Sequence, residues 1–147
     1  MKTPKGNLKK GPSRIYHHYD AAFRIWGPDT DIDGLSSVTK LQPSETHRKG
    51  DRRGNGQWED SMWSFRSMRP ETSDLEEHLN CLLDVLEPVK EGLLKTTSAR
   101  SQGIFWCAHY TNAPSGLAGT TILSSKILKR LGDFGFGFAV DTYSDCN

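Results

Sequence analysis

The sequence predicts a single α+β domain in which helices pack on one face of a mixed or antiparallel β-sheet. A length of 147 residues suits one domain. A composition of 35% hydrophobic and 25% charged residues is typical of a globular chain. Some segments repeat apolar residues with the period of a strand and others with the period of a helix. Together these observations favour the element order β-α-β-α-β-β-α-β within residues 18–147, after a flexible basic tail over residues 1–17.

The first half of the domain is expected to hold two strands and a short helix. Ala21, Phe23 and Ile25 alternate with other residue types, which predicts a strand over residues 19–26. The other elements expected here are a short helix that begins near Asp31 and ends by Pro43, a polar loop over residues 44–57 and a strand over residues 58–67.

A long helix is the clearest element of the second half. Ser73 and Glu76 have the spacing of a capping box. A leucine stripe follows with helical period, and Pro88 is expected to interrupt the helix before it continues to about Leu94. The remaining elements expected are a buried strand over residues 104–110, a short strand ending at Leu123, a helix capped by Ser124 or Ser125 and closed by Gly132, and a last strand over residues 134–143.

No motif assembles a catalytic centre, and no cofactor or metal site is expected. Cys107 and His109 are alternate residues of a strand, which implies no chemistry by itself. The Phe/Gly-rich segment 134–138 resembles a base-stacking strand only in part, so we interpret its aromatic residues as core. Three cysteines without a CxxC pair and short apolar runs favour a cytoplasmic protein with no membrane partner.

Two surfaces are candidates for binding. The first is a basic, Gly-containing loop over residues 47–53, which could hold an anion beside nearby tryptophans. Its candidate ligand-binding residues are Arg48, Lys49, Arg52, Trp58 and Trp63. The second is an acidic stripe on the long helix, which could meet a basic partner. The acidic stripe consists of Glu77, Asp84, Glu87 and Glu91.

The order of several short motifs resembles the family called domain of unknown function 4279. These motifs are Phe23-x-Ile25-x-Gly27, Leu41-x-Pro43, Arg48-Lys49-Gly50-Asp51, Trp63, Leu75-Glu76-Glu77-His78-Leu79 and Asp141-x-Tyr143. The resemblance covers about residues 19–143. It implies a small bacterial cytoplasmic α+β protein with no established activity, and it transfers no catalytic residue.

The favoured hypothesis is a non-enzymatic protein-interaction domain of the immunity or antitoxin type, whose acidic stripe binds a basic partner such as a toxin. A small domain without a catalytic constellation and with opposed charged surfaces favours it. The alternative is a small anionic-ligand binder, or an enzyme, that uses the basic loop. Single-stranded nucleic-acid binding is a weaker alternative, and a nucleic-acid partner is not expected.

Overall fold

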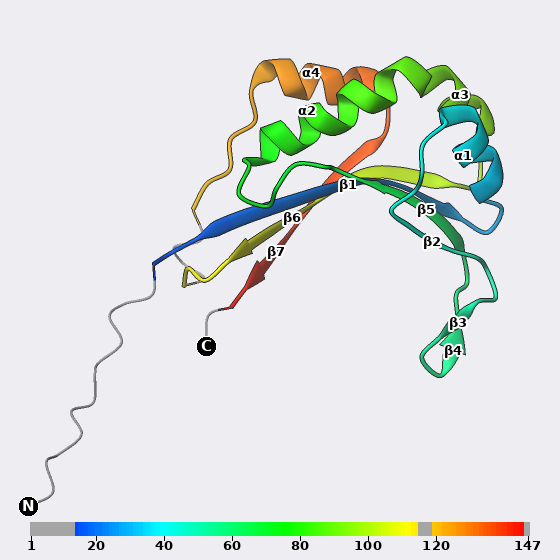
Figure 1. Ribbon diagram of the computed structural model, residues 1–147, viewed down its shortest axis with the longest axis horizontal. Helices are drawn as coiled ribbons and strands as arrows, with labels where there is room; N and C mark the ends of the chain where they lie inside the picture. Colours follow the sequence, from blue (N-terminus) through cyan, green and yellow to red (C-terminus); the bar gives the residue numbers. More distant parts are fainter. Residues whose placement is uncertain (1–13, 115–118, 146–147) are drawn as a thin grey trace, which may run out of the picture.

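The computed structural model describes residues 14–114 and 119–145 and places most of their strands in one mixed sheet (Figure 1). The sheet consists of β1 (His17–Gly27), β2 (Glu45–His47), β5 (Ser61–Arg66), β6 (Gln102–Thr111) and β7 (Gly137–Ser144). A separate hairpin consists of β3 (Arg52–Arg53) and β4 (Gly56–Gln57). The helices are α1 (Ile32–Thr39), α2 (Leu75–Leu86), the 3-10 turn η1 (Glu87–Val89), α3 (Lys90–Thr96) and α4 (Ser125–Phe134).

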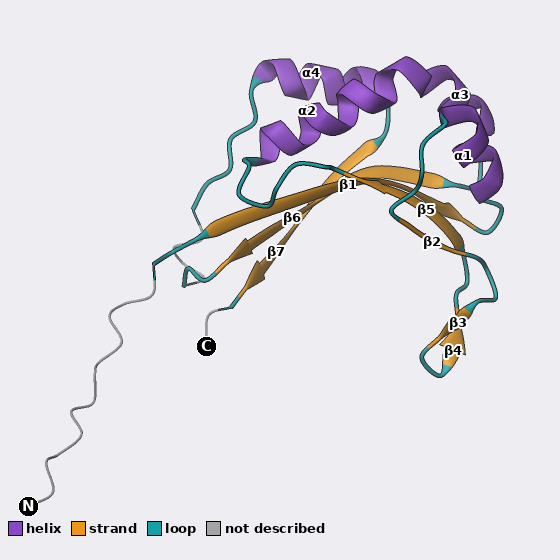
Figure 2. Ribbon diagram, viewed as in Figure 1, coloured by secondary structure: helices purple, strands orange, loops and turns teal. Residues whose placement is uncertain are grey.

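The strands of the main sheet follow the order β2-β5-β1-β6-β7. Neighbours are antiparallel except β6 and β7, which are parallel. A parallel neighbour needs a crossover connection, and α4 lies in that connection. All the helices lie on one side of the sheet (Figures 1 and 2). The predicted α+β class, with a mixed sheet and helices on one face, is therefore confirmed.

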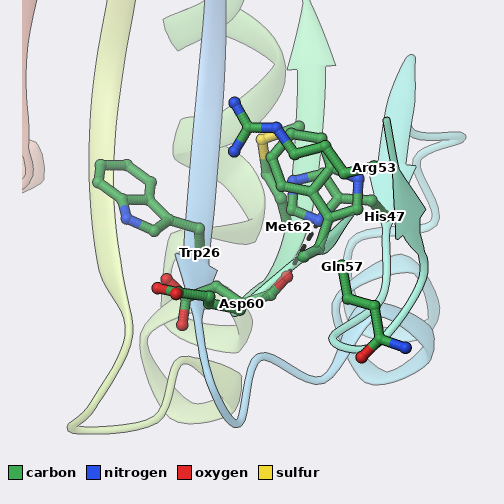
Figure 3. Close-up of a pocket in the computed structure, with 8 residues that line it drawn as sticks. Trp26, His47, Arg53, Gln57, Asp60 and Met62 are labelled. Atoms are coloured by element: carbon green, nitrogen blue, oxygen red, sulfur yellow. Dashed lines mark hydrogen bonds between the residues drawn. The ribbon is translucent and has the colours of Figure 1, made fainter. Parts of the chain in front are cut away.

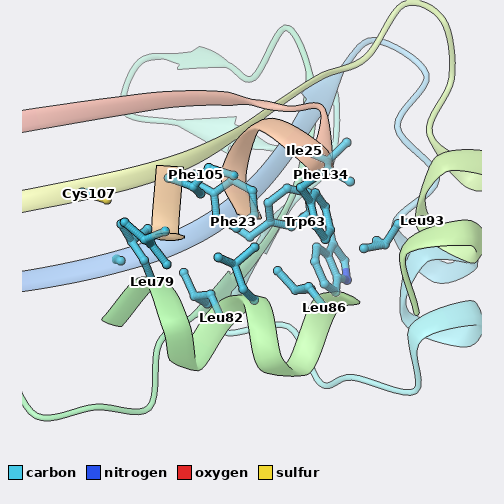
Figure 4. Packing of buried hydrophobic residues seen from close by; sticks show 14 of the residues in the cluster. Phe23, Ile25, Trp63, Leu79, Leu82, Leu86, Leu93, Phe105, Cys107 and Phe134 are labelled. Atoms are coloured by element: carbon cyan, nitrogen blue, oxygen red, sulfur yellow. The ribbon is translucent and has the colours of Figure 1, made fainter. Parts of the chain in front are cut away.

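The core forms between the helices and the face of the sheet that the helices cover. Phe23 and Ile25 of β1 are fully buried, as are Trp63 of β5 and Phe105 of β6 (Figure 4). The leucine stripe of α2 packs on them, and Leu82 is 0% exposed. The apolar side of the strands thus packs against the apolar side of α2. This confirms which side of the helix the sequence predicted to be buried.

The start of α2 differs from the prediction by one residue. Asp74, not Ser73, is the N-cap, and its side chain accepts a hydrogen bond of 2.8 Å from the backbone N–H of Glu77. The Glu77 carboxylate accepts one of 3.0 Å from the Asp74 N–H in return. The prediction failed because the sequence holds two adjacent residues of capping type, each followed three positions later by Glu. Pro88 lies in η1, where the expected restart between α2 and α3 occurs.

The C-terminal third departs most from the expected elements. No strand forms over residues 119–124, because the free edge of β6 pairs with β7 instead. Helix α4 does not close at Gly132; it continues to Phe134 and ends at Gly135, which has a φ of +86°. A glycine with a left-handed backbone conformation just after a helix is a common C-cap. Both Gly132 and Gly135 could have filled this position, and the sequence alone did not distinguish them.

The proposed aromatic core of the last strand is correct only in part. Phe134 is helical and 2% exposed, and Phe136 is half-buried against Phe23. Phe138 and Val140 are 41% and 43% exposed, so their assignment to the core is wrong. They belong to the edge strand of the sheet, whereas α2 packs on the central strand β1.

The predicted loop over residues 44–57 contains short strands. Strand β2 pairs with β5 at the edge of the main sheet, and β3 and β4 form the small hairpin. Residues 14–16 of the predicted tail are described and contact the end of β6: Tyr16 N–H donates to the Asn112 side chain at 2.8 Å. Residues 1–13 of that tail lie outside the described residues.

Candidate functional site: a cleft under the hairpin

The side of the sheet that faces away from the helices forms an open face. Alternate residues of a strand point to opposite sides, so Arg24 and Trp26 point away from the core that contains Phe23 and Ile25. Trp26 pairs in register with Met62 of β5, and Met62 pairs with His47 of β2. Three strands therefore place these side chains in one row at the end of the sheet that lies beside the β3–β4 hairpin.

A tight turn over residues 48–51 sets the direction of that hairpin. Gly50 has a φ of +90°, a conformation that favours glycine. The Asp51 carboxylate accepts a hydrogen bond of 2.8 Å from the backbone N–H of Arg48, and the Gly50 N–H donates to the Trp58 carbonyl at 2.9 Å. The motif Arg48-Lys49-Gly50-Asp51 thus has a structural role, because it closes the base of the hairpin.

Trp58 is the centre of a three-layer stack beside this turn. The His47 ring stacks on it with 3.7 Å between centroids and 6° between planes. The Arg53 guanidinium lies 4.2 Å from the centroid of the Trp58 ring. His47 is fixed in turn, because its Nδ1–H donates to the Asp60 carbonyl at 3.0 Å. A guanidinium held flat on an indole keeps its in-plane N–H groups available to a ligand.

The stack forms one wall of a cleft of about 330 Å³, which we call the hairpin cleft. Trp26 lies on the opposite side, and Met62 lies between the two walls (Figure 3). The complete lining is Trp26, His47, Arg53, Gln57, Trp58, Glu59, Asp60 and Met62. The cleft is at the small end of the range of small-molecule sites, and it offers apolar walls with a few polar groups.

The structure brings only one of the five predicted ligand-binding residues to this cleft, namely Trp58. Arg48 points elsewhere and pairs with Asp33 at 3.0 Å. Arg52 is exposed and donates to the Gly54 carbonyl at 3.4 Å. Lys49 is also exposed, and its backbone N–H donates to Ser61.

Trp63 lies on the other side of the sheet from the hairpin cleft. It is 0% exposed, and its Nε1–H donates to the Ser36 hydroxyl of α1 at 3.0 Å. Trp63 is therefore a core residue that anchors α1. The prediction from the sequence missed Trp26, although the strand alternation places it opposite Phe23 and Ile25. That alternation was the signal that could have found it.

The acidic stripe is where the sequence placed it, but its charges have partners within the chain. Arg130 of α4 reaches across to α2 and η1, and one of its terminal nitrogens lies 2.8 Å from the Asp84 carboxylate and 2.9 Å from that of Glu87. These contacts raise the pKa of Arg130 further above its usual range, chiefly through the hydrogen bonds to Glu87. Asp84 and Glu87 thus fasten α4 to α2.

The other two members of the acidic stripe are paired more loosely. Glu77 caps α2 and lies 3.4 Å from Arg69, while Glu91 lies 2.8 Å from Lys95. Exposed pairs of this kind contribute little to stability, at most about 1 kcal/mol. The stripe is therefore a mixed-charge surface rather than a purely acidic one.

Cys107 and His109 do not form a nucleophile–base pair. Burial raises the pKa of the Cys107 thiol to about 12, so the thiol stays protonated and unreactive at neutral pH. His109 instead forms a ring–ring hydrogen bond of 2.8 Å with Nδ1 of His17. Burial lowers the pKa of His109.

Across residues 14–114 and 119–145, no three His, Cys, Asp or Glu side chains gather as a metal site requires. None of the helices in these ranges combines the length and apolarity needed to cross a membrane.

Comparison with known proteins gives a family but no annotated function. The family model described as domain of unknown function (DUF4279) matches residues 16–145, which is nearly the whole chain. No curated protein and no solved structure matches the chain.

Proposed function

The chain belongs to the family of domain of unknown function 4279, whose description names no activity, and from the geometry of the site we propose that the protein binds a small planar anion in the hairpin cleft. The observation that carries this proposal is the His47–Trp58–Arg53 stack, which lines the cleft together with Trp26.

The walls of the cleft suit a flat ring. Trp26 and the Arg53 guanidinium both offer π faces to the cleft, on which an aromatic ring would stack. Met62 below supplies an adaptable apolar floor. The shape therefore favours an aromatic ligand over a flexible aliphatic one.

The charge of the cleft selects the orientation of the ligand. Within the described part of the chain no carboxylate forms an ion pair with Arg53. Its charge is thus available to a negative group on the ligand. Glu59 and Asp60 also line the cleft and would accept hydrogen bonds from donors elsewhere on the ring.

The test uses naphthalene-2-sulfonate, a planar monoanion, titrated by calorimetry at constant ionic strength. Wild type should bind saturably, and Arg53→Gln and Trp26→Ala should each weaken binding at least about tenfold, as expected for a charge-assisted contact and a stacking face. Arg52→Gln is the matched control, because Arg52 is the neighbouring arginine of the same hairpin but does not line the cleft.

Equal losses of ligand affinity in Arg52→Gln and Arg53→Gln would overturn the proposal, because they would show that the hairpin attracts anions only through its overall charge. Absence of saturable binding by wild type would also overturn the proposal. The natural ligand could then be sought by mass spectrometry of small molecules that copurify with wild type but not with Arg53→Gln.

A second candidate function is binding of a basic protein partner by the acidic stripe, as in an immunity or antitoxin-type protein. The observation in its favour is a shallow depression of about 490 Å³ on the outer face of α2. Arg69, Glu77, Asn80, Cys81, Asp84 and Val85 line it. The pairing of these acids with Arg69 and Arg130 leaves less free charge than the sequence implied.

The test of this second function uses Glu77→Gln with Glu91→Gln, since Gln at position 77 can keep the capping box. Association with a partner identified in the native host should become slower and less dependent on salt. Unchanged association would mean that the acidic stripe is only a solvated surface. Asp133→Asn serves as a control, because Asp133 lies on α4 outside the acidic stripe and pairs with Lys129 of the same helix.

A further inference from the structure

A second hollow lies on the open face, next to the row that forms the hairpin cleft. It has a volume of about 240 Å³. Asp20, Ala22, Arg24, Ser44, Glu45, Ser64, Arg66, Trp106 and Tyr110 line it. Ala22 pairs in register with Arg66 on one side and Trp106 on the other, so a small side chain lies between two long ones. We call this space the Arg24 hollow.

Arg24 lies on one wall of the hollow in a fixed position. Its guanidinium carbon is 3.9 Å from the centroid of the Trp106 ring. The Trp106 indole is fixed in turn, because its Nε1–H donates to the Asp141 carboxylate at 2.7 Å. Residues of three adjacent strands thus hold the guanidinium over the indole before any ligand arrives, and Asp141 of the motif Asp141-x-Tyr143 has a positioning role.

Arg24 has no partner for its hydrogen bonds in the described ranges. No carboxylate there forms an ion pair with it, and its Nε atom is buried without a hydrogen bond. The other arginine of the hollow differs, since Arg66 pairs with Asp20 at 2.6 Å. The Nε atom is too buried for a ligand to reach, so an acceptor from outside the chain would bind the terminal N–H groups of the guanidinium, which no described carboxylate contacts.

The charges around the hollow define which acceptor fits. The lining holds Arg24 and Arg66 together with Asp20 and Glu45, and Arg66 pairs with Asp20. Arg24 is thus the cation of the hollow that no described carboxylate pairs with. Asp20 and Glu45 would repel a dianion more strongly than a monoanion. The in-plane N–H groups of a stacked guanidinium match the two oxygens of a planar carboxylate.

We infer that the Arg24 hollow is a second binding site, which takes the carboxylate group of a small molecule. This site goes beyond the function proposed for the hairpin cleft. It requires Arg24 held by Trp106 and Asp141, and it requires neither Arg53 nor Trp58.

The experiment is an NMR titration of the whole chain with sodium acetate, with sodium chloride added to keep the ionic strength constant. The Nε–H signal of Arg24 and the Nε1–H signal of Trp106 should shift saturably. Arg24→Gln should weaken the response at Trp106 at least about tenfold, since charge-assisted hydrogen bonds are lost. Arg24→Lys should fail to restore it, because an ammonium lacks the planar fork.

Two controls isolate the site. Arg53→Gln alters the hairpin cleft and should leave acetate binding unchanged, so the two proposals can fail independently. Inorganic phosphate is the competing probe and should bind more weakly than acetate. Tighter phosphate binding would overturn the assignment to a carboxylate, and a linear, unsaturated shift in wild type would overturn the site itself. The wild-type signals decide this even if Arg24→Gln does not fold.

Discussion

The two faces of the main sheet use the same strands in opposite ways. On the helix-covered face, Phe23 and Ile25 are fully buried, and the charged side chains above them are paired, as Arg130 is with Asp84 and Glu87. On the open face, Arg24 lies over an indole with no acidic partner among the described residues. The unpaired arginine is thus on the face where binding is proposed, and the paired Arg130 is on the face that holds the core. Substitutions on the two faces should therefore have separate effects.

The largest effect is expected in the core. Leu82→Ala should lower the free energy of unfolding by about 2–5 kcal/mol, because Leu82 is 0% exposed and the leucine stripe is what α2 buries. Urea denaturation measures this. A loss below about 1 kcal/mol would mean that the helix-covered face does not carry the stability assigned to it.

The second largest loss of stability is expected where Gly103 of β6 packs closely against Phe136. A Cβ at Gly103 would lie 2.3 Å from Cδ1 of Phe136, so Gly103→Ala should cost about 1–3 kcal/mol through overpacking. Gly132→Ala is the matched control, since a Cβ there meets nothing within 4 Å and alanine favours a helix. Thermal unfolding of the two variants should shift in opposite directions.

Reversing the charges that Arg130 contacts should have a smaller effect. Asp84→Lys with Glu87→Lys replaces two partners of a half-buried arginine by like charges, which should cost about 1–2 kcal/mol. Stability equal to wild type would show that the α2–α4 contact does not depend on these pairs.

Low pH should destabilise the fold through protonation of His78, which is buried on the helix-covered face of the sheet. This side chain is 0% exposed, its Nδ1 hydrogen-bonds with Ser67 at 2.9 Å, and burial is the main cause that lowers its pKa. The unfolded chain therefore binds this proton more readily, so stability is full above about pH 6.5 and falls as the pH drops below it. One such proton changes stability by at most about 1.4 kcal/mol per pH unit.

The check is urea denaturation of wild type and His78→Gln at several pH values. The variant should have lower stability at pH 8 but a flatter dependence between about pH 6.5 and pH 5. Parallel curves for the two proteins would assign the acid sensitivity to other groups.

The smallest effect on stability should come from the open face. Arg53→Gln should change the free energy of unfolding by about 0.5 kcal/mol or less, as exposed-surface substitutions usually do, while it weakens ligand binding. Calorimetric unfolding alongside the binding titrations measures both. A large loss of stability here would end the distinction between the two faces.

Patterns close together in the sequence predicted the fold better than they predicted the site. The alternation around Phe23 and the leucine stripe of α2 report burial directly, and both elements formed as expected. The parallel pairing of β6 with β7 depends on a choice between two partners for one strand edge, which no local pattern encodes.

The same limit applies to the candidate site. The basic loop was identified, but charge alone did not distinguish Arg53, which lies over Trp58 and lines the cleft, from Arg52, which does not line it. Trp63 was placed beside the loop because it is near in sequence, yet strand alternation sends it to the core. Arg24 and Trp106 come from strands more than 70 residues apart, so their contact became visible only in the folded chain.

The central position of β1 has a consequence for how the chain folds during synthesis. This strand is made first, but its neighbours β5 and β6 come much later in the chain. At about 5–20 residues per second, the roughly 84 residues between Gly27 and Thr111 need about 4–17 s. The edge of β1 that pairs with β6 stays open throughout that interval, and the edge that pairs with β5 stays open until Arg66 is made. Unpaired edges of an apolar strand are prone to aggregation. The nascent chain should therefore depend on chaperones far more than refolding of the complete chain does.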